Sequence, residues 1–234
     1  MVEQARLGGS AGRAGEAGWV AGAAERSFGT VARVSHDVRP ATPVDLPEAA
    51  LTLVRAFEHY PWTRWSIPAD DHLARLEELQ LLYLAHALRH GVVLVDDEVH
   101  GVGAFLPPGA PDPDDATQAR VVELMDDRLP AVMSADLPPR PAGAWDLATL
   151  GVRPGSAGRG LGSAVIAEGL RRVDGMMSSV ALETSDARNV RLYERHGFVV
   201  TGSTEIPDGP VVWSMCREAT SPAGTVTRSG PTAG

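Results

Sequence analysis

Three glycines at alternate positions give the sequence its clearest chemical signal. Gly158, Gly160 and Gly162 follow an apolar stretch at 146–152 and precede an amphipathic stretch that ends near residue 173. This order predicts a strand, a glycine turn and a helix. Glycines let a phosphate approach the backbone without meeting a Cβ, and the first N–H groups of a helix carry partial positive charge and have no partner within the helix. The stretch therefore predicts a site for a phosphate-bearing ligand.

Two common nucleotide-binding turns do not fit this stretch. A P-loop requires a lysine directly after its last glycine, and a count from Gly155 gives Leu161 at that position. A dinucleotide-binding turn requires a glycine three residues after its second one, and the two possible registers give Ser163 and Val165 there. The sequence therefore disfavours both classes of nucleotide site.

The overall composition limits the class of protein. The 234 residues are 44% hydrophobic and 22% charged, which is typical of a globular protein, and the net charge of −9 disfavours a nucleic-acid binder, which needs a basic surface. No apolar run could span a bilayer, and the N-terminus lacks a signal-peptide pattern. The single cysteine, Cys216, cannot form an internal disulfide and indicates a reducing compartment. We expect a cytoplasmic protein, a monomer or a homodimer, that binds neither nucleic acid nor membranes.

Composition also predicts where the folded domain lies. Residues 1–33 are rich in Gly and Ala with little periodicity, and residues 219–234 have the same character, so we expect both segments to be disordered. Residues 34–218 then form one mixed α/β domain with helices on both faces of the sheet. The expected strands are 38–42, 92–95, 99–105, 146–152, 180–183, 198–202 and 211–216, and the expected helices are 45–59, 71–89, 116–134, the stretch from the glycine turn to 173, and 187–196.

Aromatic and histidine residues supply further candidates. Tyr60, Trp62 and Trp65 lie within six positions, although aromatic residues make up only 5% of the chain. They are either a lid packed on the sheet or the wall of an acceptor pocket, because a flat aromatic substrate can stack on rings. His86 and His90 share one face of a predicted helix, but no third ligand or HExxH pattern accompanies them. We therefore expect no metal site.

The glycine turn resembles the acetyl-CoA signature of the GNAT N-acetyltransferases, which reads (Gln/Arg)-x-x-Gly-x-(Gly/Ala). Gly160 and Gly162 match that signature, and Ala157 departs from it at the first position. A second stretch, residues 193–198 (YERHGF) with Asn189 before it, resembles the end of the same fold. The resemblance implies a mostly antiparallel sheet with a splayed central strand pair, and acetyl-CoA as the cosubstrate.

The resemblance also implies a reaction in which an amine attacks the thioester directly in a ternary complex. Tyr193 would be the general acid, since a phenol with an ordinary pKa of about 10 is protonated at neutral pH. A backbone N–H near Leu150 would stabilise the oxyanion. Glu183 is the candidate base, directly or through water, and Asp146 and His59 are weaker ones. Core packing for Tyr193 and a salt bridge for Glu183 stay open as alternatives.

The implied contacts to the two substrates come from different parts of the chain. Tyr60, Trp62 and Trp65 would line the acceptor pocket. The acetyl-CoA contacts would come from Leu150, Gly151, Val152, Gly158, Arg159, Gly160, Leu161, Gly162, Ser163 and Asn189.

A narrower resemblance is to the puromycin N-acetyltransferases, and it extends over roughly residues 38–217. It implies acetylation of the free amine of an aminoacyl-nucleoside antibiotic, and hence antibiotic resistance or self-protection. Another amine acceptor, such as a peptide N-terminus or a polyamine, stays open, as does a fold that binds CoA or a small molecule without catalysis. The similar pieces include 60–64, 71–72, 78–80, 144–149, 160–165, 182–185 and 211–215.

Overall fold

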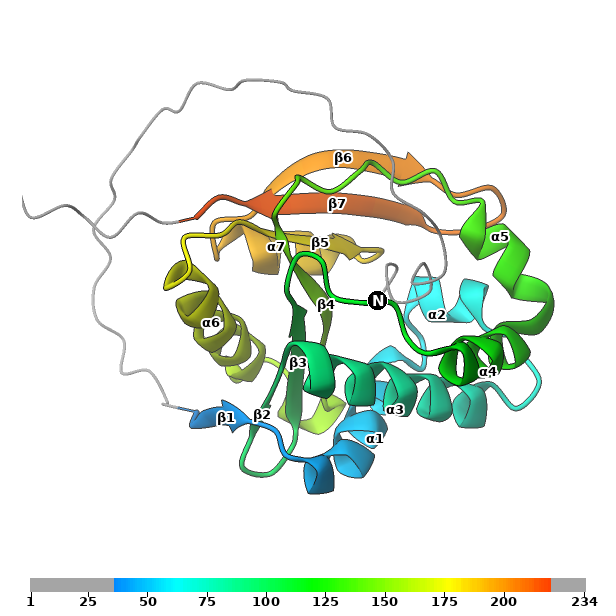
Figure 1. Ribbon diagram of the computed structural model, residues 1–234, viewed down its shortest axis with the longest axis horizontal. Helices are drawn as coiled ribbons and strands as arrows, with labels where there is room; N and C mark the ends of the chain where they lie inside the picture. The colour runs from blue at the N-terminus through cyan, green and yellow to red at the C-terminus, as the bar shows by residue number, and fades with distance from the viewer. Residues whose placement is uncertain (1–35, 220–234) are drawn as a thin grey trace, which may run out of the picture.

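A single sheet organises residues 36–219, the part of the chain that the computed structural model describes. The sheet has seven strands in the order β1-β2-β3-β4-β5-β7-β6 (Figure 1). The segment 1–33 that we expected to be disordered, and all but the first residue of 219–234, lie outside the described residues. The strands are β1 (Val38–Pro40), β2 (Val92–Asp96), β3 (Gly101–Leu106), β4 (Trp145–Val152), β5 (Val180–Thr184), β6 (Val199–Glu205) and β7 (Val211–Arg217).

The helices connect these strands in the expected order, with two differences. The expected helix 116–134 is interrupted after Met125, and Pro130 lies in the first turn of the short helix that follows, where its missing N–H is tolerated. The aromatic stretch after Tyr60 forms a helix that we did not expect. The helices are α1 (Leu46–Phe57), α2 (Pro61–Ser66), α3 (His72–His90), α4 (Asp115–Met125), α5 (Leu129–Met133), α6 (Leu161–Asp174) and α7 (Ala187–Glu194).

The pairing of the strands confirms the expected sheet. All neighbouring strands are antiparallel except β4 and β5, which are parallel. In the described chain β4 and β5 pair only as Trp145 with Val180 and Asp146 with Ala181, so the two strands diverge beyond that point. A register shift on the β3 side of β4 leaves Ala148 as an extra residue, and such a bulge bends a strand. The sheet is therefore mixed, mostly antiparallel and splayed at its centre.

Two apolar clusters cover the two faces of the sheet. On one face α1 and α3 pack on β2–β4 through residues such as Leu53, Leu76 and Leu84. On the other face α6 contributes Val165, Ile166, Leu170 and Val173, which follow helical spacing and are buried. At one end of the molecule α4 and α5 lie beside α3 and α2 (Figure 1). Within residues 36–219, no helix combines the length and the apolar character that a bilayer crossing requires.

Candidate active site

A cavity of about 710 Å³ lies where β4 and β5 diverge. Its walls come from the end of α1 and the start of α2, from the last residues of β4, from the glycine turn with the first turn of α6, and from α7. The splay therefore brings together segments that are far apart in the sequence. Most of the residues that we expected to contact acetyl-CoA line this cavity: Leu150, Gly151, Val152, Gly158, Gly160, Leu161, Gly162, Ser163 and Asn189.

The glycine turn is shaped by its backbone conformation. Gly158 and Gly160 have φ angles of 78° and 89°, a backbone conformation that residues with a side chain rarely adopt. A Cβ at either position would meet no atom within 4 Å. The first backbone hydrogen bond of α6 runs from the N–H of Ala164 to the carbonyl oxygen of Gly160, at 2.9 Å. The N–H groups of 161–163 precede that bond and lie at the cavity. The turn thus presents the free N–H groups and positive end of a helix to a ligand.

The end of β4 forms the floor of the same cavity. Leu150, Gly151 and Val152 line it. In an antiparallel or parallel sheet, successive N–H groups point to opposite neighbours. Because the described part of β4 has no pairing with β5 beyond Asp146, the N–H groups that point toward β5 have no partner on that strand. Such a donor can stabilise a developing oxyanion.

Tyr193 reaches the cavity from α7. The residue is 6% exposed, and its ring lies 5.8 Å from the ring of Phe198 in an edge-to-face arrangement. Burial raises the pKa of the Tyr193 phenol well above its ordinary value, and the nearby Tyr60 adds to this effect. The phenol therefore stays protonated at neutral pH and can donate its proton.

The three aromatic residues of the 60–65 stretch have different surroundings. Tyr60 lines the cavity, and its hydroxyl accepts a hydrogen bond from the N–H of Ser185 at 2.8 Å and lies 2.8 Å from Oγ1 of Thr184. Trp62 is 2% exposed and packs in the core on the α1 and α3 face. Trp65 packs against Trp62, with ring centroids 5.0 Å apart. Among these three residues, only Tyr60 lines the cavity.

The candidate bases occupy two different places. Glu183 and Asp146 are buried, and both carboxylates contact the same nitrogen of Arg140: Nη2 lies 3.0 Å from Oε2 of Glu183 and 2.9 Å from Oδ1 of Asp146. Neither carboxylate is among the described residues that line the cavity. His59 is exposed and lines it. The salt bridge that the sequence left open for Glu183 is therefore present.

Several cationic residues at the cavity were missed by the sequence analysis. Arg55 of α1 and Arg188 and Arg195 of the α7 region line the cavity, whereas Arg159 contributes its carbonyl oxygen to His36 Nε2 at 2.9 Å. Arg188 is held by Asp186, at 2.7 Å. Arg188 and Arg195 lie close to Asn189 and Tyr193 in the chain, which is the signal that could have found them. No motif marks Arg55.

His86 and His90 lie one turn apart on α3. The rings of His86 and His90 lie 4.7 Å apart. Burial, followed by the neighbouring charges of His90 and Arg89, lowers the pKa of His86, which favours the neutral ring. Over residues 36–219, no group of three or more His, Cys, Asp or Glu side chains could hold a metal ion.

Comparison with known proteins places these features in context. A model of the acetyltransferase (GNAT) family matches residues 54–198. An acetyltransferase from Corynebacterium glutamicum, described as histone acetyltransferase HPA2 and related acetyltransferase, is 27% identical with a TM-score of 0.65, over 82% of this chain and 100% of that chain. Arylalkylamine N-acetyltransferase 2 from Aedes aegypti is 14% identical with a TM-score of 0.60, over 79% and 99%, which is a likeness of fold.

Proposed function

Because the chain belongs to the acetyltransferase (GNAT) family, whose members use acetyl-CoA, we propose that it transfers the acetyl group to a primary amine of a small molecule. The leading candidate acceptor is puromycin or a related aminoacyl-nucleoside antibiotic. The observation that carries the proposal is the shared cavity: the anion-binding turn of α6 and the protonated phenol of Tyr193 lie on its walls.

The groups on the cavity walls match the chemistry of the pyrophosphate and the pantetheine arm of acetyl-CoA. The N–H groups of 161–163 and the glycine turn would hold the pyrophosphate, and Arg55, Arg188 or Arg195 would add positive charge for a phosphate. Leu150–Val152 would contact the pantetheine arm, and Asn189 would contact it from α7. This arrangement would place the thioester where β4 and β5 diverge, between β4 and Tyr193.

The reaction then needs three groups. A β4 N–H near Leu150 stabilises the oxyanion as the amine nitrogen bonds to the acetyl carbon. The C–S bond breaks, the attacking nitrogen releases its second proton to solvent, and Tyr193 gives its proton to the leaving thiolate and regains one from solvent. Glu183 takes the proton of the ammonium through water, since an α-amino group with a pKa of roughly 8 is only partly neutral at pH 7. The products are the acetylated amine, CoA thiol and a proton.

Two points bear on the acceptor. The resemblance to puromycin N-acetyltransferases that we infer from the sequence includes the Tyr60 stretch, and Tyr60 lies at the cavity, where a flat base could stack on its ring. The solved structure from Corynebacterium glutamicum is described as a histone acetyltransferase, which favours a protein lysine as the second candidate acceptor. Both acceptors present a primary amine, so they require the same chemistry at the thioester.

One assay separates these possibilities. The release of CoA thiol from acetyl-CoA is measured with puromycin, spermidine, a lysine-containing peptide and a peptide with a free N-terminus. We expect release with puromycin at least tenfold faster than with the other amines at equal concentration. Faster release with the lysine peptide would mean that the acceptor is a protein lysine and not puromycin, with the proposed acetyl transfer unchanged. Tight CoA binding without release for any amine would contradict the proposed activity.

A further inference from the structure

A polar cluster behind the glycine turn joins three segments that are far apart in the sequence. Arg153 directly follows β4, and its Nη2 donates to the Glu48 carboxylate of α1 and to Oγ1 of Thr52 at 3.1 Å. Thr52 is fully buried, and its hydroxyl donates to the carbonyl oxygen of Val99 at 2.6 Å. Val99 lies between β2 and β3. This Arg153 cluster (Glu48, Thr52, Val99 and Arg153) therefore connects α1 and the β2–β3 hairpin to the start of the glycine turn.

The backbone of Val99 has an unusual conformation. Its φ is 55°, in the left-handed region, where a β-branched residue is a genuine outlier and a glycine would be unstrained. The valine side chain is buried in the apolar cluster on the α1 and α3 face, and its carbonyl oxygen accepts the bond from Thr52. Strained positions persist where the surroundings fix them, and they concentrate near functional sites. The end of the hairpin is thus held in one position against α1.

The two residues after this strained valine contact the glycine turn at both of its ends. The carbonyl oxygen of His100 accepts a hydrogen bond from the N–H of Arg153 at 2.7 Å, and its Nδ1 lies 3.2 Å from Oγ of Ser156. Gly101 packs so closely on Leu161, the first residue of α6, that a Cβ at Gly101 would lie 2.7 Å from Cγ of Leu161. Ser156 and Leu161 both line the cavity. The hairpin therefore supports the turn where it begins and where it enters α6.

The glycine content of the turn makes such support important. Glycine loses more conformational freedom on ordering than any other residue, and an added Cβ at Gly158 or Gly160 would meet open space. A site whose donors are already in place binds its ligand more tightly, because the cost of ordering is not incurred at binding. The N–H groups of 161–163 follow these glycines directly. Contacts made from outside the turn, as at Arg153 and Ser156, therefore help to place these donors.

We propose that Arg153 is a positioning residue for acetyl-CoA, which fixes the glycine turn to α1 and the β2–β3 hairpin and so holds the N–H groups of 161–163 where the pyrophosphate binds. The inference rests on the proposed function and deepens it, since it assigns part of the affinity for the cosubstrate to residues behind the turn. Arg153 is not among the described residues that line the cavity, so it acts through the turn. Its guanidinium stays charged and exchanges no proton.

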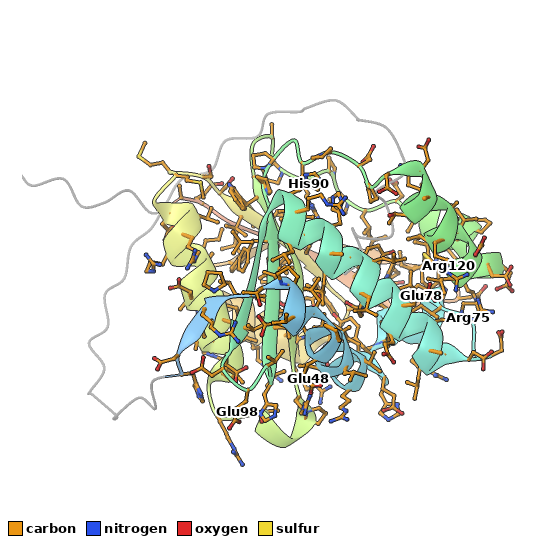
Figure 2. The ribbon with its side chains drawn as sticks, turned by 60° about the horizontal axis from the view of Figure 1, so that its bottom comes forward. Glu48, Arg75, Glu78, His90, Glu98 and Arg120 are labelled. Atoms are coloured by element: carbon orange, nitrogen blue, oxygen red, sulfur yellow. The ribbon has the colours of Figure 1, made fainter. Side chains whose placement is uncertain are left out.

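Arg75 of α3 is a matched control at another place in the fold. Its side chain is 19% exposed, as is that of Arg153. It also bonds a carboxylate and a neutral oxygen, since Nη2 donates to Oδ2 of Asp70 at 2.7 Å and Nη1 donates to the carbonyl oxygen of Leu124 at 3.1 Å. Figure 2 shows Arg75 where α3 meets α4, away from Glu48 of the Arg153 cluster. Arg75→Gln therefore removes a similar arginine without changing the support of the glycine turn.

The first test is a calorimetric titration of CoA, which binds without reacting, at a temperature where all variants are folded. We expect Arg153→Gln to weaken CoA binding about tenfold, because the turn must then be ordered at binding and one lost hydrogen bond to a charged group sets the scale of that cost. The KM for acetyl-CoA should rise by a similar factor, with kcat for the fastest amine of the panel nearly unchanged. Arg75→Gln should lower the melting temperature and leave CoA affinity unchanged. An equal loss of affinity in Arg75→Gln, or none in Arg153→Gln, would overturn the inference.

A second pair of substitutions separates positioning from direct attraction between the guanidinium and a phosphate. Thr52→Val removes the bonds of the Thr52 hydroxyl and alters no charge, so CoA binding should weaken by about fivefold. Thr52→Ser keeps the hydroxyl and should bind CoA as wild type does. These two variants remain decisive if Arg153→Gln does not fold. Direct attraction alone would leave Thr52→Val with wild-type affinity, and that result would contradict the positioning role.

Arg153→Lys makes the same distinction from the other side. An ammonium keeps the charge but lacks the planar fork that bonds Glu48 and Thr52 together, so this variant should recover only part of the affinity that Arg153→Gln loses. CoA binding as tight as in wild type would mean that charge alone acts, and would overturn the inference. Wild-type protein that binds CoA but acetylates no amine would contradict the proposed function and would leave the binding comparison of these variants valid.

Discussion

The two halves of the cavity are lined in different ways. At the α6 half the lining groups are backbone N–H donors, positioned by the left-handed conformation of Gly158 and Gly160. At the α1 and α7 half they are side chains, among them Tyr193 and Tyr60, whose hydroxyl is hydrogen-bonded to Ser185 N–H. A backbone site depends on the path of the chain and tolerates changes in side chains, whereas a side-chain site loses its chemistry with one atom. The first half should therefore set affinity for acetyl-CoA and the second half should set turnover.

The largest expected effect comes from the side-chain half. Tyr193→Phe removes the proposed proton donor, and general acid catalysis typically contributes at least about 100-fold, so we expect kcat to fall by about that factor. The dissociation constant of acetyl-CoA, measured by calorimetry, should change less than about twofold. Tyr83→Phe is the matched control, since Tyr83 is also a buried tyrosine whose pKa burial raises, and it lies on α3 outside the cavity lining. Equal losses of kcat in Tyr193→Phe and Tyr83→Phe would contradict a specific role of Tyr193 in turnover.

A smaller effect of the opposite kind is expected in the backbone half. Gly160→Ala places a side chain at a φ of 89°, which costs about 1 kcal/mol and shifts the turn, so acetyl-CoA should bind about fivefold more weakly with kcat nearly unchanged. Gly155→Ala is the control in the same turn, because its φ lies outside the left-handed region and a Cβ there meets open space. Binding titrations of the two variants give the comparison. A loss of kcat without a loss of affinity in Gly160→Ala would reverse our assignment of the two halves.

Tyr60→Phe tests whether the second hydroxyl also acts on turnover. The substitution removes the hydrogen bond from Ser185 N–H and the contact with Thr184, which hold the ring at the cavity and are worth about 1 kcal/mol of stability. Because a less fixed ring positions the amine less well, we expect a loss of up to about fivefold in kcat/KM for the amine. Acetyl-CoA affinity should not change. Steady-state rates at saturating acetyl-CoA measure the effect. If only the KM for acetyl-CoA increased, Tyr60 would contribute to cosubstrate affinity, like the glycine turn, and not to turnover.

The last expected effect is on stability in alkali and leaves activity at neutral pH aside. The buried phenols of Tyr193 and Tyr83 keep their protons in the folded protein at a pH where the unfolded chain releases them, near about 10. Their contribution is therefore complete below that pH and is lost above it, by up to about 1.4 kcal/mol per pH unit for each tyrosine. Melting temperatures between pH 8 and pH 11 should fall less steeply in Tyr193→Phe. The glycine variants should follow the wild-type slope, since they change no titrating group.

The difference between local backbone patterns and long-range side-chain contacts explains what could be predicted from the sequence. The strand at 146–152 and the helix after the glycine turn were found within a residue or two, since apolar periodicity and turn residues are local signals. The division of 116–134 was missed although Pro130 lies inside it. The partnership of Arg140 with Glu183 joins residues 43 positions apart through a loop, and no local pattern encodes such a contact. Trp62 and Tyr60 are two positions apart, yet one packs in the core and the other lines the cavity.

Only two residue pairs join β4 to β5 in the described sheet, so the backbone ladder is interrupted between β1–β4 and the β5–β7–β6 ladder, while one apolar cluster around Val165 packs against both sides. Amide hydrogens of β4 that face β3 lie in a long ladder with one bulge, so most of them should exchange with deuterium only through large openings, whereas those that face β5 beyond Asp146 should exchange early. A bound cosubstrate at this seam would slow the exchange of the second set alone.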